Sequence, residues 1–173
     1  MNLYKKCCFI GHRKIEITNE LEKALYDYIE YLIVNENVKI FLFGSKSQFD
    51  DLCYDIVTNL KEKYEGIKRI YVRSNYEFVD ETYKNYLLKY FEDTIYPNAC
   101  KGAGKLSYVK RNQAMICESD FCVFYYNKNY VPPKKVHNKR YINFITPTSG
   151  TALAFKYAKI KNKSIKNFFE QNI

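Results

Sequence analysis

The sequence is poor in the residues that make zinc sites. It has only two histidines, His12 and His137, and none of its six cysteines belongs to a C-x-x-C pair. Structural zinc sites need such ligands at short spacings, so we expect no metal site and no cofactor. Most of the cysteines fall in apolar segments, where cysteine behaves as a small hydrophobic residue. We therefore expect reduced core thiols and a cytoplasmic location.

Long apolar runs are also missing. No stretch approaches the roughly 18 apolar residues of a membrane span. The N-terminal run Cys7-Cys8-Phe9-Ile10 is too short for the core of a signal peptide and ends in Gly11-His12-Arg13. We interpret it as a first strand. With 27% charged and 47% hydrophobic residues, the chain is expected to be a soluble protein with no membrane partner.

Acidic residues are scarce in the last third of the chain. Residues 1–100 hold 14 Lys/Arg and 16 Asp/Glu, a net charge of −2, whereas residues 101–173 hold 14 and 3, a net charge of +11. This asymmetry predicts a positive field over part of the surface, suited to anionic ligands. The alternative is compositional, because lysine is abundant throughout and solvated lysines cost little.

Neither common phosphate-binding fingerprint is present. The sequence has no G-x-x-x-x-G-K-[ST] motif, and no G-x-G-x-x-G motif follows the first predicted strand. Gly102-Ala103-Gly104-Lys105 looks similar, but no clear strand precedes it. We interpret it as a flexible loop.

Strand and helix patterns nevertheless alternate along the whole chain. Strands are predicted at 5–10, 38–43, 67–72, 121–126 and 164–169, and helices begin near 19, at 50 or 51, and near 79, 108 and 150. Asn19 and Glu22 have the spacing of a capping box at the first helix. The alternation predicts an α/β protein, a Rossmann-like three-layer fold with a mostly parallel central sheet. We expect one domain over residues 1–173, with a polar insertion at about 127–147.

Candidate ligand-binding residues are expected at the carboxyl ends of these strands, where such sheets bind ligands. Glycine, serine and threonine in the turns let a ligand approach the backbone and donate hydrogen bonds to it. The candidates are Gly11, His12, Arg13, Gly44, Ser45, Lys46, Phe49, Asp50, Arg111, Asn112, Ser149, Gly150 and Thr151.

Several candidates have two interpretations. The turn 148–151 opens a predicted helix, whose first backbone N–H groups bind phosphate. Arg111 either clamps a phosphate or ribose bidentately or forms a surface salt bridge. His12 and Arg13 either contact an anionic ligand or only end the strand. Asp50 starts a helix by default, with ribose binding as the alternative.

In these residues the sequence resembles the SLOG superfamily, which includes the SMF/DprA DNA-processing proteins and the LOG enzymes. Within it, the sequence is most similar to the DUF1273, YpsA-like branch of small bacterial proteins. The resemblance lies in Phe9-Ile10-Gly11-His12-Arg13, Phe43-Gly44 to Phe49-Asp50, Arg111-Asn112 with Met115 and Ser119-Asp120, and Ser149-Gly150-Thr151 with Tyr157-Ala158. It implies a single SLOG-like domain whose turns face a nucleotide-derived ligand.

Two departures from the family bear on catalysis. LOG enzymes cleave the N-glycosidic bond of nucleoside monophosphates, using an arginine and a glutamate just after the Gly-Thr turn. The resemblance implies that Arg111 corresponds to this arginine. Here Ala152-Leu153-Ala154-Phe155 follows Thr151, so no carboxylate is supplied there for an oxocarbenium ion. The second turn has Ser45-Lys46-Ser47 in place of glycines, where the lysine either adds a charged donor or narrows the pocket.

Three functions follow from these patterns. The leading hypothesis is binding or sensing of a nucleotide-like or phosphorylated small molecule, without catalysis. The first alternative is an N-glycosidase or phosphoribohydrolase acting on nucleoside monophosphates, with Asp50, Asp51 or Glu77 as a relocated acid. The second is nucleic-acid binding through the basic C-terminal third, where tyrosines interleave with lysines. A homo-oligomer is compatible with all three.

Overall fold

A six-stranded parallel sheet forms the centre of the computed structural model, which describes residues 4–131 and 149–169. The strands are β1 (Lys5–Gly11), β2 (Val38–Phe43), β3 (Lys68–Val72), β4 (Asp93–Ile95), β5 (Phe121–Tyr125) and β6 (Ser164–Asn167). Their order across the sheet is β4-β3-β2-β1-β5-β6, and each neighbouring pair of described strands is parallel. The chain changes direction across the sheet between β1 and β5. Such a switch point leaves a crevice at the carboxyl edge.

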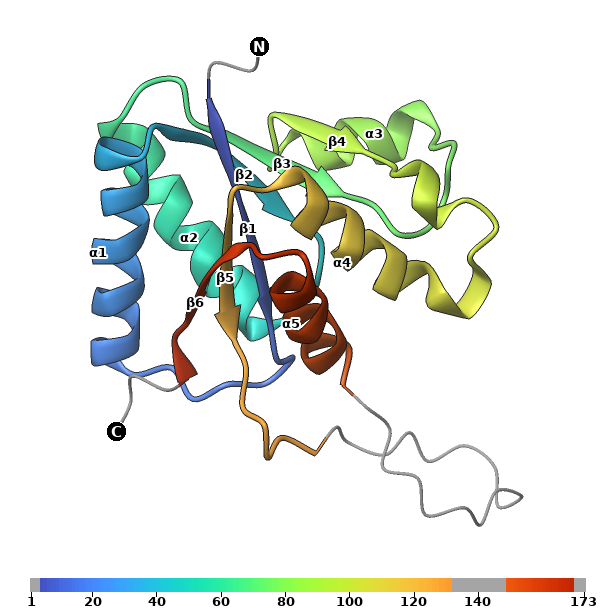
Figure 1. Cartoon of the computed structure of the whole chain (residues 1–173). Coiled ribbons are helices and arrows are strands. Elements are labelled where there is room, and N and C mark those ends of the chain that lie inside the picture. Colours follow the sequence, from blue (N-terminus) through green and yellow to red (C-terminus); the bar gives the residue numbers. More distant parts are fainter. Residues whose placement is uncertain (1–3, 132–148, 170–173) are drawn as a thin grey trace.

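Helices cover both faces of the sheet (Figure 1). The helices α1 (Asn19–Asn35) and α2 (Gln48–Lys63) lie on one face, and α4 (Ser107–Glu118) and α5 (Gly150–Ile160) lie on the other. The short α3 (Glu81–Leu88) packs beside β4 at the edge. The predicted Rossmann-like three-layer α/β fold is therefore confirmed, and the described sheet is wholly parallel.

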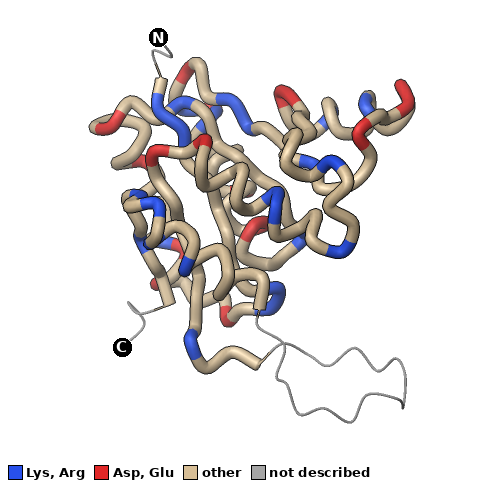
Figure 2. The backbone as a smooth tube through the Cα atoms, turned by 45° about the vertical axis from the view of Figure 1, so that its right-hand side comes forward, with Lys and Arg blue, Asp and Glu red and all other residues tan. Residues whose placement is uncertain are grey.

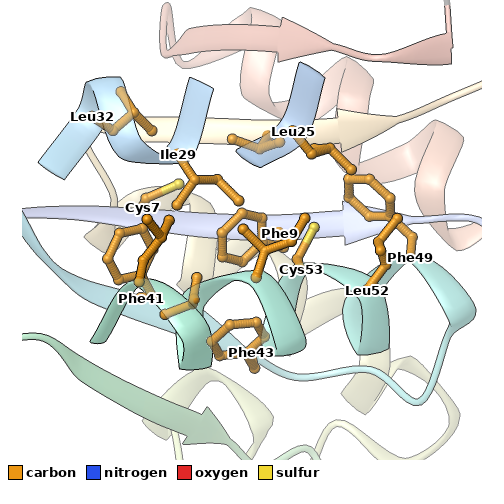
Figure 3. Close-up of a cluster of buried hydrophobic side chains, with 14 of the residues drawn as sticks. Cys7, Phe9, Leu25, Ile29, Leu32, Phe41, Phe43, Phe49, Leu52 and Cys53 are labelled. Atoms are coloured by element: carbon orange, nitrogen blue, oxygen red, sulfur yellow. The ribbon is translucent and has the colours of Figure 1, made fainter. Parts of the chain in front are cut away.

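The central strands are apolar on both sides because both faces are buried. Successive side chains of β1 point to opposite faces: Cys7 and Phe9 join the core under α1 and α2, while Cys8 and Ile10 join the core under α4 and α5. Figure 3 shows the first core, in which Phe9 stacks on a neighbouring ring of β2 with centroids 5.1 Å apart. This double burial fixes the register of β1 between its two neighbours.

Side-chain caps set where the helices begin. The Thr18 hydroxyl accepts the N–H of Leu21 at 3.1 Å, so Thr18, rather than the predicted Asn19, caps α1. Ser47 caps α2, which therefore begins before the predicted Asp50 or Asp51. In both cases a hydroxyl just upstream pairs with an otherwise free first-turn N–H and starts the helix earlier.

The edge strand β4 is absent from the sequence predictions. Its three residues, Asp93–Ile95, have no apolar run. It is held by pairing with β3 and by Arg69, whose backbone N–H and guanidinium donate to the Glu92 carboxylate at 2.6 to 3.2 Å. These partners are distant in sequence, which explains why no local pattern predicts the strand.

The described part of the chain contains neither a membrane-spanning helix nor a cluster of metal ligands. No helix of the described ranges is long and apolar enough to cross a membrane, and no group of three or more potential metal ligands occurs there. All six cysteines are free thiols, five of them buried. Of the predicted polar insertion, 132–147 and His137 within it lie outside the described residues.

Candidate functional site

A cavity of about 620 Å³ opens at the carboxyl edge of the sheet. Its walls come from the turns after β1, β2 and β3 and from the N-terminal turns of α4 and α5. The register brings these turns together, because Gly11 at the end of β1 pairs with Tyr125 at the end of β5, and Phe43 of β2 pairs with Tyr71 of β3. The cavity thus lies at the switch point, where parallel sheets bind ligands.

Most of the predicted ligand-binding residues line this one cavity. Eleven of the thirteen do so: Gly11, His12, Arg13, Gly44, Ser45, Lys46, Arg111, Asn112, Ser149, Gly150 and Thr151. The other two, Phe49 and Asp50, lie behind its wall, fully or almost fully buried. Both are on the first turn of α2 and point inward, so they support the cavity without lining it.

Close packing explains the two glycines at the ends of β1 and β2. A Cβ on Gly11 would lie 2.4 Å from Phe49 Cδ1, and a Cβ on Gly44 would lie 2.7 Å from Met115 Sδ and 2.9 Å from Arg111 Cδ. Separations below 3 Å are not tolerated between such atoms. Only glycine therefore lets these turns lie against α2 and α4.

Asp50 orders the turn between β2 and α2. Its Oδ2 accepts hydrogen bonds from the hydroxyls of Ser45 at 2.6 Å and Ser47 at 2.7 Å, and its own N–H donates to Ser47 Oγ. Burial raises the pKa of Asp50, while the two hydroxyls and the charge of Arg111 oppose that shift. Its role is thus to position the turn that carries Ser45 and Lys46 into the cavity.

Arg111 is buried in the cavity wall, with 4% of its surface exposed. Its Nη1 donates to the carbonyl of Gly44, and its Nε and Nη2 donate to Asn112 Oδ1 at 3.3 and 3.1 Å. Burial lowers the pKa of Arg111, and the Asp50 carboxylate opposes that shift. Because Arg111 is buried and forms no salt bridge within the described residues, the surface salt-bridge alternative is wrong. Three of its five N–H groups are used, which leaves two for a ligand.

His12 is buried and has a fixed tautomer. Its Nε2 accepts the backbone N–H of Asn127 at 2.9 Å, and its ring stacks on Tyr130 with centroids 3.9 Å apart. With Nε2 as acceptor, the proton of the neutral ring is on Nδ1, which has no partner among the described residues. Burial lowers the pKa of His12. His12 is therefore fixed in the cavity wall by its contacts with Asn127 and Tyr130.

One wall of the cavity was not predicted from the sequence. It consists of the turn after β3, including Asn75 and Tyr76, together with Tyr83 of α3 and Tyr108 of α4. The rule that placed the other turns at the carboxyl edge also applies to β3. The sequence pattern predicted only a helix near 79 and another near 108, however, and neither pattern indicated that these residues line a cavity.

The charge of the cavity is one-sided. Arg13, Lys46, Arg73 and Arg111 line it, whereas no Asp or Glu of the described residues does. None of the three carboxylates considered as a relocated acid is there: Asp50 is behind the turn, Asp51 is outside the lining, and Glu77 pairs with Lys101 at 2.5 Å. The lining of the cavity is thus cationic, and its described residues supply no carboxylate to a developing oxocarbenium ion.

Fold and site together define a Rossmann-like α/β protein with a cationic cavity at its switch point. No protein-family model matches the chain, and no curated protein matches it either. Any inference about function therefore depends on the geometry of the cavity.

Proposed function

We propose that the protein binds a nucleotide-like, phosphorylated small molecule in this cavity, as a SLOG-type ligand-binding or sensing domain. The observation that supports this is the composition of the cavity: arginine and lysine side chains and a helix N-terminus, with no carboxylate among its described residues. Such an arrangement stabilises a phosphate dianion, because the cations attract its charge and no carboxylate of the described lining repels it.

The phosphate is assigned to the N-terminus of α5. Ser149 caps this helix, because its hydroxyl accepts the N–H of Ala152 at 3.0 Å. The N–H groups of Gly150 and Thr151 precede the first intrahelical hydrogen bond and have no acceptor among the described residues, so they can donate to an oxyanion. Among the residues that the structure describes, no side chain obstructs Gly150, since a Cβ placed there meets none of their atoms within 4 Å.

The size of the cavity favours a small molecule over nucleic acid. A volume of about 620 Å³ falls in the range of about 300–1,000 Å³ that holds drug-sized ligands and cofactors. In addition, Figure 2 shows lysines and arginines spread over the described chain with acidic residues between them. A nucleotide-sized ligand fits both observations.

Calorimetric titration with AMP, GMP, CMP, UMP, ADP-ribose and cyclic dinucleotides tests the proposal. We expect Arg13→Gln to weaken binding of the tightest ligand roughly 10- to 100-fold, as for the loss of a charged hydrogen bond. Lys14→Gln is the matched control, since Lys14 is the next residue, is exposed and lies outside the cavity. Silence of the wild-type protein across the panel would contradict the proposal.

A further inference from the structure

We propose that the β3 end of the cavity is a subsite for the heterocyclic base of the ligand, with Tyr76 as its stacking platform. This inference rests on the proposed function and adds the ligand's orientation: phosphate at α5, base at β3. The base subsite consists of the turn after β3 and the tyrosines of α3 and α4, which are separate from the phosphate site proposed at α5.

The cavity has two chemically different ends. The N-terminus of α5 and Arg13 belong to the β1–β5 side, whereas Tyr71, Tyr76 and Tyr83 belong to the β3 side. Arg13 follows β1 and α5 packs against β1, so with strands about 4.8 Å apart the two spacings from β3 to β1 separate the ends by roughly 10 Å. This separation suits a ligand with an anionic group at one end and an aromatic group at the other.

Arg73, the cation at the β3 end, is engaged by the protein through Nη1, while its Nε has no hydrogen-bond partner among the described residues. Its Nη1 donates to the carbonyls of Tyr76 at 2.5 Å and Glu77 at 3.3 Å, and its guanidinium lies 5.7 Å from the ring centroid of Tyr96. It therefore holds the turn in place. The surface that this end presents to a ligand is mainly aromatic.

Tyr76 has an unusual backbone conformation for its residue type. Its φ is +62°, in the left-handed region that glycine and asparagine adopt most readily, and 72% of its surface is exposed. Neither the backbone nor burial of the ring explains a tyrosine there. Strained residues of this kind concentrate at ligand sites, and an exposed ring on the cavity rim provides a face on which a base stacks.

Asn75 provides a polar group beside that ring. Its Nδ2 donates to the Tyr108 hydroxyl at 3.2 Å, and its Oδ1 accepts from the Ser107 hydroxyl at 3.3 Å. An amide has two donor and at least two acceptor positions, so one of each remains. Held by two partners on α4, Asn75 is pre-oriented to pair with a donor and an acceptor on the edge of a base.

The test compares ligands with and without a base on matched variants. AMP, GMP, CMP, UMP and ribose 5-phosphate are titrated into the wild-type chain, Tyr76→Asn and Phe78→Asn. Asparagine keeps the left-handed backbone and removes the ring. Phe78 is the control, because it is two residues away, 87% exposed and outside the cavity. Thermal unfolding verifies that each variant is folded.

We expect Tyr76→Asn to weaken binding of the tightest mononucleotide about 5- to 100-fold and to leave the affinity for ribose 5-phosphate unchanged. Phe78→Asn is expected to change neither affinity. Equal loss for both probes, or no loss for either, overturns the base subsite and leaves the phosphate site standing. So does wild-type binding of ribose 5-phosphate as tight as that of the nucleotides. If the wild type binds none of these probes, the base subsite fails; silence toward ADP-ribose and the cyclic dinucleotides as well contradicts the proposed function.

Discussion

Two buried charged residues that are far apart in sequence support the same turn of the cavity wall. Asp50 and Arg111 illustrate this: the carboxylate holds the hydroxyls of Ser45 and Ser47, while the guanidinium holds the carbonyl of Gly44. Both ends of one turn are thus fixed by buried charged groups whose charges also attract each other. Such a turn is ordered before a ligand arrives, which reduces the entropy cost of binding.

The pH dependence of stability has a contribution from His12. Burial lowers the pKa of its imidazole in the folded protein, so below about pH 6.5, the ordinary histidine value, the unfolded chain binds a proton that the folded protein resists. Stability is therefore lost as the pH falls through this range.

Urea unfolding between pH 7.5 and 5.5 measures this effect. We expect the wild-type protein to lose more stability on acidification than His12→Gln, which has no group at this position that titrates in the range. Parallel decreases for the two proteins would show that His12 does not carry the effect.

At the scale of elements, glycines determine how closely the turns and helices pack. The turn after β1 lies against α2 because Gly11 has no side chain to meet Phe49. Phe49 in turn belongs to the core under α1 and α2 and contacts Tyr125 of β5, with ring centroids 5.8 Å apart. The position of the cavity wall is therefore tied to the hydrophobic core.

Substituting Gly11 tests this packing. Gly11→Ala is expected to lower the free energy of unfolding by about 1–3 kcal/mol, because the methyl group overlaps the buried ring of Phe49. Gly150→Ala is the control, since a Cβ there meets nothing within 4 Å, and we expect it to change stability by less than about 1 kcal/mol. Urea denaturation of both variants measures the difference, and equal effects would contradict the packing argument.

At the scale of the molecule, the sheet order places the turns of four adjacent strands, β3, β2, β1 and β5, along one edge. The cavity on that edge takes arginines from three separate segments, at Arg13, Arg73 and Arg111. None of them is near another in the sequence, and the cationic character of the cavity arises only when the sheet assembles.

The proposed binding function predicts that the protein does not consume its ligand. Incubation with AMP, GMP, CMP or UMP should release no free base above a protein-free control, because no described carboxylate reaches the cavity. Chromatography of the reaction mixture measures this. Base release that Arg111→Ala abolishes would favour the N-glycosidase alternative.

The α/β class, most strand and helix positions and about half of the cavity-lining residues could be predicted from the sequence. These follow from local rules: apolar runs bounded by turns, a 3.6-residue period in helices, and small polar residues where strands end. The predicted strand 38–43 coincides with β2 for this reason.

Which side chains face the cavity depends on the tertiary structure. Phe49 and Asp50 follow the β2 turn directly, but the rotation of α2 turns their side chains into the protein. Tyr76, Tyr83 and Tyr108 form one wall because β3, α3 and α4 meet at the same edge. The same holds for the anion site proposed at the start of α5: the cationic side chains of the cavity come from other segments, and long-range packing brings them together.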